Sequence, residues 1–171
     1  MEMRRRKKNR LKDYDYSQPG CYFITICTFN KENFFWAHNP VGADIIRPSR
    51  QTLSQYGVIV EQAILDIPCH YTGITVDKYV IMPNHVHMIL RLPQMCGRII
   101  SAPTKSVSTI IGQMKRHSSK KCGVPFWQKG FYDRIIRDKT EYLRICKYIE
   151  TNPAKWQEDI YYAVPREERL L

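Results

Sequence analysis

An α+β fold is what this 171-residue sequence predicts, and three observations predict it. Short runs of β-branched and aromatic residues alternate with segments whose apolar residues recur every three or four positions. The order of these segments is β-α-β-β-α-β, followed by one more helix. No stretch repeats, and 43% of the residues are hydrophobic, which is enough for one core. We therefore expect residues 1–171 to form a single domain, with a basic arm at 1–12 and a tail at 153–171.

The first two elements are a strand and a helix. The run YFITICTF at residues 22–29 is rich in β-branched and aromatic side chains, which favours a strand. A segment with many turn residues follows it. From Thr52 to Ile67 the pattern is helical, with Thr52 or Ser54 as the N-cap and Pro68 as the residue that ends the helix.

Two strands joined by a tight turn come next. They are GITVDKYVIM at 73–82 and HVHMILRL at 85–92. Pro83 and Asn84 suit the centre of a turn, because proline has a fixed φ and asparagine tolerates a positive φ. Since side chains alternate along a strand, His85 and His87 are expected to point to one face of the sheet.

The last elements are a helix, a strand and a further helix. The first of these helices runs from about Thr104 to Ser119, and its core stripe is Val107, Ile110, Ile111 and Met114. An aromatic loop leads into a strand within residues 125–137. The final helix spans roughly 139–151 and is expected to end before Pro153, because a residue that precedes proline avoids the α region.

This order of elements is that of the ferredoxin-like split βαβ fold. Such a fold has an antiparallel sheet with two helices on one face. Its other face is then available to a ligand.

The final helix has a polar flank. At 100° per residue, its core stripe consists of Tyr142, Ile145, Cys146 and Ile149. Tyr148 lies beside this stripe, with Arg144 one turn before it and Asn152 one turn after it. If this flank faces the histidines, two imidazoles, an amide oxygen and a phenol meet. Two imidazoles and an oxygen suit a divalent metal that acts as a Lewis acid on a phosphate, and the phenol is a candidate nucleophile.

Charge and composition restrict the class of partner and the compartment. The formal net charge of +11 indicates an anionic partner such as nucleic acid or an acidic membrane surface. No apolar stretch reaches the roughly 18 residues of a membrane span, so no membrane insertion is expected. Six scattered cysteines without a C-x-x-C pair indicate reduced thiols and a cytoplasmic location. The segment GRIISAPTKS lacks the second glycine and the spacing of a P-loop, so a nucleotide site is not expected there.

Three blocks of sequence resemble a known family. They are RLKDYDYSQPGCYFITICT, DKYVIMPNHVHMIL and FWQKGFYDRIIRDKTEYLRICKYIETNPAKW, which follow one another along nearly the whole chain. In these blocks the chain is similar to the single-tyrosine HUH transposases, and above all to their REP-associated branch. The tail departs from the pattern, because many relatives continue with NPVKAG where this chain has NPAKWQ.

The resemblance implies a role for each residue that matches the family motif. His85, His87 and Asn152 would be ligands of Mg²⁺ or Mn²⁺, and Tyr148 would be the nucleophile. It also implies a single-stranded DNA hairpin of the REP type as substrate, together with a 5′-phosphotyrosine intermediate and a freed 3′-hydroxyl. Both a monomer and a homodimer occur among relatives, and the REP-associated branch favours the monomer.

Two other functions stay open at this point. A hairpin-binding protein that has lost cleavage would keep the basic arm and the sheet, with the histidines as remnants. A rolling-circle replication nuclease shares the histidine pair but usually places a lysine near its tyrosine, whereas this chain has Asn152 four residues on. Without their context, the histidines would be read as a hydrogen-bonded pair, Tyr148 as an ordinary helix residue and Asn152 as a helix C-cap.

Lysines, arginines and aromatic side chains are the candidates for DNA contact. Lys and Arg would hold phosphates; the candidates are Arg4, Arg5, Arg6, Lys7, Lys8, Arg10 and Lys12 in the arm, and Lys115, Arg116, Lys120, Lys121, Arg134 and Arg137 beyond it. Aromatic rings stack on splayed bases; the candidates are Tyr14, Tyr16, Phe126, Trp127, Phe131 and Tyr132. For Trp127 and Phe131, packing in the core is the favoured interpretation.

Overall fold

One antiparallel sheet of four strands forms the centre of the molecule. The computed structural model describes residues 14–37, 53–93 and 106–162. The strand order is β2-β3-β1-β4, and the strands are β1 (Gly20–Cys27), β2 (Thr75–Ile81), β3 (His85–Leu92) and β4 (Tyr132–Ile136). This is the predicted ferredoxin-like arrangement, in which each crossover helix joins two strands separated by a third.

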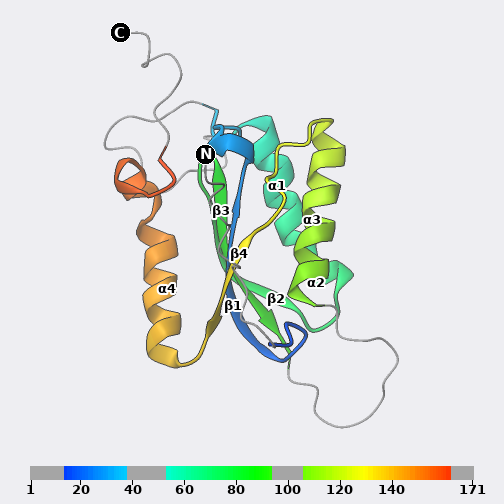
Figure 1. The fold of residues 1–171 in the computed structure, drawn as a ribbon, viewed down its shortest axis with the longest axis vertical. Helices are drawn as coiled ribbons and strands as arrows, with labels where there is room; N and C mark the ends of the chain where they lie inside the picture. Colours follow the sequence, from blue (N-terminus) through cyan, green and yellow to red (C-terminus); the bar gives the residue numbers. More distant parts are fainter. Residues whose placement is uncertain (1–13, 38–52, 94–105, 163–171) are drawn as a thin grey trace, which may run out of the picture.

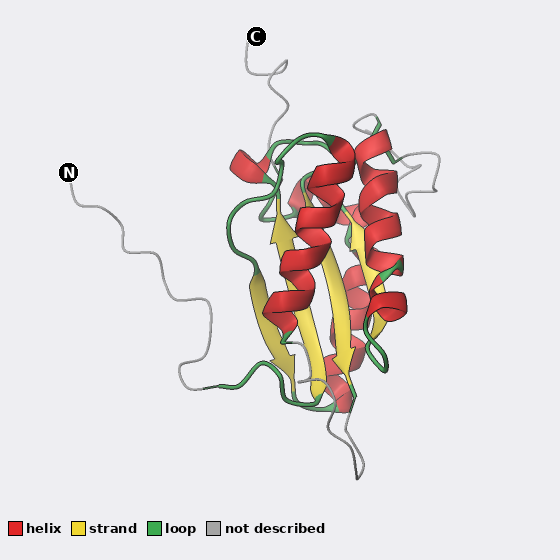
Figure 2. Cartoon of the chain, turned by 90° about the vertical axis from the view of Figure 1, so that its right-hand side faces the viewer, coloured by secondary structure: helices red, strands yellow, loops and turns green. Residues whose placement is uncertain are grey.

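Helices cover both faces of this sheet. Helices α1 (Gln55–Leu65) and α3 (Val107–Cys122) lie together on one face, and α4 (Lys139–Thr151) lies on the other (Figure 1). Figure 2 shows the first pair in front of the strands. The predicted pair of helices on one face is thus confirmed. The opposite face is not bare, however, because α4 lies over it and is followed by the short helix η4 (Pro153–Glu158).

Each long helix begins at a side-chain cap, and α3 and α4 bury all or part of their predicted stripes. Ser54, Ser106 and Asp138 accept hydrogen bonds from backbone N–H groups of the first turns of α1, α3 and α4. The stripe of α3 is fully buried, and in α4 Ile145 and Ile149 are the buried members. The predicted start of α3 at Thr104 lies outside the described residues.

Helix α4 ends at Thr151, before Pro153, as predicted, whereas Pro68 does not end α1 in the way the sequence predicts. Helix α1 ends at Leu65, and Pro68 sits in the first turn of α2 (Ile67–His70), where an N–H group would have no partner in the helix. Asn152 keeps helical angles of φ −57° and ψ −43° although Pro153 follows it. Its N–H donates to the Tyr148 carbonyl at 2.9 Å, so Asn152 remains one helical turn from Tyr148.

The turn between β2 and β3 is tight, as predicted, but Asn84 does not adopt a positive φ in it. The Met82 N–H donates to the His85 carbonyl across the turn at 2.8 Å. In the described segments, the residues other than glycine with positive φ are Asn30 and Lys31, in the short helix η1 (Phe29–Lys31). Asn84 therefore contributes through the hydrogen bonds of its side chain.

Two expectations from composition concern membranes and thiols. Within the three described segments, no helix combines the length and the apolar character that crossing a bilayer requires. The cysteines in these segments are all free thiols, and Cys96 lies outside them.

Candidate metal and tyrosine site

Two buried imidazoles at the start of β3 form the centre of the site. The exposed fractions of His85 and His87 are 0% and 1%, and their Nε2 atoms lie 3.0 Å apart. Burial lowers the pKa of His87 to about 3. The pKa of His85 is held well below its ordinary value, first by burial and then by the charges of His87 and Lys31. Both rings are therefore neutral near pH 7, which is the form that binds a metal.

Strand β1 supplies the neighbours of His87. Thr25 stands directly opposite His87 in the sheet, and its Oγ1 lies 2.8 Å from His87 Nδ1. Phe23, two residues earlier on the same face, stacks on the His87 ring with centroids 5.3 Å apart. With Nδ1 bonded to the threonine hydroxyl, His87 presents Nε2 to the site.

Asn84 holds His85 in one tautomer. Its Nδ2 donates to the carbonyls of Lys31 and Tyr161 at 3.0 and 2.9 Å, which fixes the direction of the amide. Its Oδ1 then faces His85 Nδ1 at 2.9 Å and accepts the proton of that nitrogen. His85 Nε2 consequently carries a lone pair, which points into the site where His87 Nε2 lies 3.0 Å away. Sequence reasoning placed Asn84 in the turn and missed this contact.

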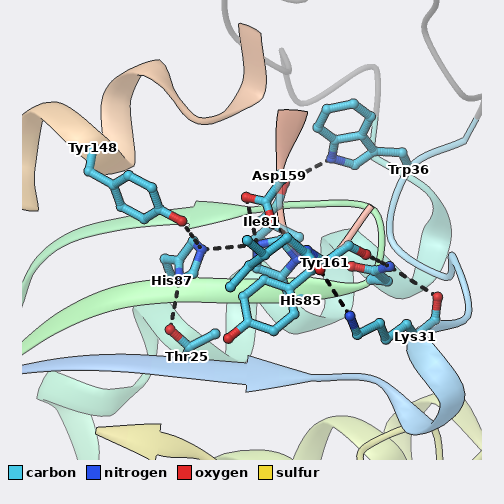
Figure 3. Close-up of polar contacts among 11 residues, drawn as sticks. Thr25, Lys31, Trp36, Ile81, His85, His87, Tyr148, Asp159 and Tyr161 are labelled. Carbon is cyan, nitrogen blue, oxygen red and sulfur yellow. Dashed lines mark hydrogen bonds and ion pairs between the residues drawn. The ribbon is translucent and has the colours of Figure 1, made fainter. Parts of the chain in front are cut away.

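Tyr148 reaches the pair from α4. Its hydroxyl lies 3.2 Å from His87 Nε2, and its ring meets the His87 ring with centroids 5.2 Å apart (Figure 3). Burial and the charge of Asp159 raise the pKa of Tyr148 to about 12, against a hydrogen bond from Asn152 that lowers it. The Tyr148 side chain is still 40% exposed. It is therefore a phenol with access to solvent beside two imidazoles without such access.

Asn152 lies beside this phenol and is 4% exposed. Its Oδ1 is buried and has no hydrogen-bond partner among the residues described. A buried amide oxygen without a partner is costly, and a bound cation would satisfy it. The structure thus brings Tyr148 to His87 and keeps Asn152 beside Tyr148; the spacing along the final helix predicted the second relation, and the packing of α4 on the sheet supplies the first.

The tail supplies residues that sequence reasoning missed. Asp159 Oδ2 lies 3.9 Å from His85 Nε2, and the Asp159 side chain is 3% exposed. The rings of Trp156 and Tyr161 lie 5.9 and 4.7 Å from the His85 ring, measured between centroids. Lys31 Nζ donates to the Ile160 carbonyl at 3.0 Å, which ties the loop after β1 to the tail. The sequence shows no spacing that would have signalled these contacts.

The donor atoms of the site fit a divalent metal. His85, His87 and Asp159 each offer one ligand atom, and these atoms lie within 4.8 Å of one another. Two atoms bound side by side to one ion at about 2.1 Å lie about 3.0 Å apart, which is the separation of the two imidazole nitrogens. Nitrogen and oxygen donors in this mixture suit Mg²⁺, Mn²⁺ or a later transition metal.

The candidate DNA contacts divide between the two faces of the sheet. Lys115, Arg116, Lys120 and Lys121 lie on α3, across the sheet from Tyr148 (Figure 1). Lys115 Nζ donates to the carbonyls of Gln128 and Gly130 at 2.6 and 3.1 Å, so its ammonium group already has partners. Arg134 is exposed and pairs with Glu141 at 2.6 Å, and Arg137 is exposed just before α4. The basic arm lies outside the described residues.

Two of the aromatic residues expected to stack on bases belong to the core. Tyr16 and Phe126 are buried, and Phe126 packs in a cluster with Phe34, Phe35 and Trp127. The prediction was wrong for both, because the sequence does not reveal which ring the loops enclose. Tyr132 is exposed and remains a candidate.

The site combines a four-stranded antiparallel sheet, a buried His-x-His pair on β3 and the hydroxyl of a tyrosine on α4. Comparison with known sequences then places the chain. The family described as "Transposase IS200 like" matches residues 49–152. This chain belongs to that family, and its members process DNA as transposases.

Individual relatives agree with this placement. A protein of Haemophilus influenzae described as "Uncharacterized protein" is 36% identical and covers 92% of this chain and 93% of its own length. A second from the same organism, "Putative REP-associated tyrosine transposase", is 21% identical over 82% of this chain and 74% of its own length. A solved structure of a REP-associated tyrosine transposase bound to a REP hairpin covers 86% of this chain and 74% of that chain, with a TM-score of 0.59 and 22% identity. That likeness shows that the two proteins share a fold.

Proposed function

We propose that this protein cleaves and rejoins single-stranded DNA, with Tyr148 as the nucleophile and a divalent metal held beside it. The observation that carries the proposal is the position of the Tyr148 hydroxyl, 3.2 Å from His87 Nε2 at the edge of a buried imidazole pair. A phenol is placed there on a helix, with access to solvent, whereas the rings it touches are enclosed. This is the arrangement that attack on an external phosphodiester requires.

The proposed reaction is a transesterification. Tyr148 Oη forms a bond to phosphorus, and the bond from phosphorus to the 3′-oxygen breaks. The phenol loses its proton, and the departing 3′-oxygen gains one. The products are a 5′-phosphotyrosine and a free 3′-hydroxyl, so one ester replaces another and no nucleoside triphosphate is consumed. Attack of a 3′-hydroxyl on the phosphotyrosine reverses these bonds and rejoins a strand.

His85, His87 and Asn152 are the residues proposed to hold Mg²⁺ or Mn²⁺. When bound, such an ion withdraws charge from the phosphate oxygens and makes phosphorus more electrophilic. Thr25 and Asn84 hold the Nδ1 side of each ring, so that both Nε2 atoms would be available to bind the ion. Asn152 donates to the phenol and thereby favours its ionised form.

The proposed substrate is a single-stranded DNA hairpin. A relative of the same fold is described as bound to a REP hairpin, and the net charge of +11 favours an anionic partner. The basic arm from Arg4 to Lys12, together with Arg116, Lys120, Lys121, Arg134 and Arg137, would contact phosphates. We propose that the protein acts as a monomer, because the histidine pair and the tyrosine meet within one chain. The proposed location is the cytoplasm.

A covalent adduct tests the proposal. The protein is incubated with Mn²⁺ and 5′- or 3′-labelled single-stranded hairpins from its own genome, and the products are separated under denaturing conditions. We expect a stable adduct that retains the label lying 3′ of the cleaved bond, and a released fragment with a 3′-hydroxyl. Tyr148→Phe should abolish the adduct and retain hairpin binding.

Tyr132→Phe is the matched control, because Tyr132 is 44% exposed and Tyr148 is 40% exposed, and because the change removes only the hydroxyl and keeps the ring that could stack on a base. It should form the adduct at the wild-type rate. An adduct that persists in Tyr148→Phe would exclude this nucleophile. Tight hairpin binding by the wild type with no adduct on any hairpin would instead support the binding protein that has lost cleavage.

A further inference from the structure

The carboxylate of Asp159 faces an atom that cannot donate to it. Asn84 Oδ1 accepts the Nδ1 proton of His85, so His85 Nε2 carries a lone pair. Asp159 Oδ2 lies 3.9 Å from this nitrogen, and the Asp159 side chain is only 3% exposed. The carboxylate oxygen and this nitrogen have no hydrogen between them, so neither satisfies the other although both are enclosed. A cation between the two atoms would bind both.

The distances suit a shared cation better than a direct contact. The separation of 3.9 Å is too long for a hydrogen bond. Two ligands of one ion at about 2.1 Å lie between about 3.0 Å apart when adjacent and about 4.2 Å when opposite. Both the pair of imidazole nitrogens, at 3.0 Å, and the pair of His85 Nε2 and Asp159 Oδ2 fall in this range.

The segment that carries Asp159 is built against the same rings. Trp156 and Tyr161 lie on the His85 ring, and the Tyr161 carbonyl accepts from Asn84. Asp159 Oδ1 accepts from the Tyr161 N–H at 2.7 Å, which leaves Oδ2 directed at the histidines (Figure 3). One oxygen of the Asp159 carboxylate therefore points to the histidines, and the other accepts a backbone hydrogen bond within the tail.

We propose that Asp159 is a further ligand of the metal held by His85 and His87, so that metal binding and docking of residues 153–162 are coupled. This inference rests on the proposed function, which supplies the metal. A carboxylate adds a negative charge to two neutral imidazoles and thereby favours a hard divalent cation such as Mg²⁺ or Mn²⁺. It also makes the tail part of the active site.

Mn²⁺ binding to the metal-free full-length protein tests the inference without any cleavage assay. Titration calorimetry and the electron paramagnetic resonance signal of free Mn²⁺ give the affinity. Asp159→Asn keeps the Oδ1 that accepts from Tyr161 but removes the charge, and it should weaken Mn²⁺ binding at least about tenfold. Glu158→Gln, at the exposed neighbouring residue, is the matched control and should bind as the wild type does.

Thermal unfolding separates a ligand from a merely structural residue. Without metal, Asp159→Asn should unfold at the same temperature as the wild type or higher, because an enclosed charge is removed. Saturating Mn²⁺ should raise the unfolding temperature of Asp159→Asn by less than it raises that of the wild type. Hydrogen exchange at the amides of residues 156–162 should slow on Mn²⁺ addition in the wild type and not in the variant.

Each outcome decides between the two proposals. Equal Mn²⁺ affinity in Asp159→Asn and the wild type, with binding lost in His85→Ala, overturns the role of Asp159 and leaves the histidine site intact. A wild type that does not bind Mn²⁺, or a His85→Ala variant that binds as well as the wild type, overturns the metal site of the proposed function itself. A lower metal-free unfolding temperature in Asp159→Asn with unchanged Mn²⁺ affinity identifies a structural residue.

Discussion

The two halves of the candidate site are held in different ways. The half on β3 consists of His85 and His87, which are enclosed and bonded at Nδ1 to Asn84 and Thr25. The other half consists of Tyr148 and Asp159, which lie on α4 and the tail and touch the first half through a few atoms. The strand half is fixed by the sheet, whereas the helix half is docked onto it.

This difference matches what each half is proposed to do. A metal site needs ligands whose directions are set before the ion arrives, and hydrogen bonds behind the imidazoles set them. A nucleophile that attacks a large substrate needs access, and Tyr148 has it. The difference also implies that changes in the strand half act mainly on metal affinity, while changes in the helix half act on docking and on attack as well as on metal affinity.

Removal of the Trp156 side chain should have the largest effect on stability. This ring is buried, stands 6.4 Å from the Trp36 ring and covers His85. Trp156→Ala should lower the free energy of unfolding by about 3–5 kcal/mol, because a large core side chain is lost. Urea denaturation measures this. Leu143→Ala on the exposed side of α4 is the control, with a change within about 0.5 kcal/mol. A loss below about 1 kcal/mol for Trp156→Ala would mean that the tail undocks independently of the core.

Asn84→Ala tests the strand half. The change leaves the Lys31 and Tyr161 carbonyls and His85 Nδ1 without the partner they now have. We expect a loss of about 1–3 kcal/mol in unfolding free energy and a fall of about 10–100-fold in Mn²⁺ affinity. The nitrogen chemical shifts of His85 should show that the ring no longer keeps one tautomer. An unchanged tautomer and affinity would contradict the role given to Asn84.

Asp77 links the two halves by polar contacts and should have a smaller effect. Its carboxylate accepts from Arg91 Nε at 2.9 Å and from the Tyr142 hydroxyl of α4 at 3.1 Å. Burial alone would raise the pKa of Asp77, but the hydrogen bonds from Arg91, Thr75 and Tyr142 hold it below its ordinary value of 3.8. Asp77→Asn should therefore cost up to about 1 kcal/mol at pH 7, since Arg91 is partly exposed.

The pH dependence of this cost has a definite sign. A carboxyl group whose pKa is lower in the folded state contributes its full stability above the unfolded pKa. That contribution is lost as the pH falls through the folded pKa, which here lies below 3.8. The difference in stability between wild type and Asp77→Asn should thus be constant from pH 5 to 7 and shrink below pH 3.8. A difference that grows on acidification would contradict this assignment.

Much of the fold followed from local patterns. The periods of two and of three to four residues identified the strands and helices, and the stripe of α3 is buried as predicted. The role of Pro68 was predicted wrongly, because proline fits the first turn of a new helix as well as it ends an old one, whereas the end of α4 before Pro153 was predicted correctly. A residue before proline usually avoids the α conformation, but Asn152 adopts it. In this conformation the Asn152 N–H donates a hydrogen bond to the Tyr148 carbonyl.

By itself, the sequence determined which residues share a face. Alternation on a strand put His85 and His87 side by side, and a spacing of four put Asn152 next to Tyr148, because these relations depend only on backbone geometry. Only the tertiary structure decided which faces meet. The contacts of Asn84 with Lys31 and Tyr161, and of Asp159 with His85, join segments 53 to 77 residues apart. Such contacts depend on how whole elements pack, and no local period encodes that packing.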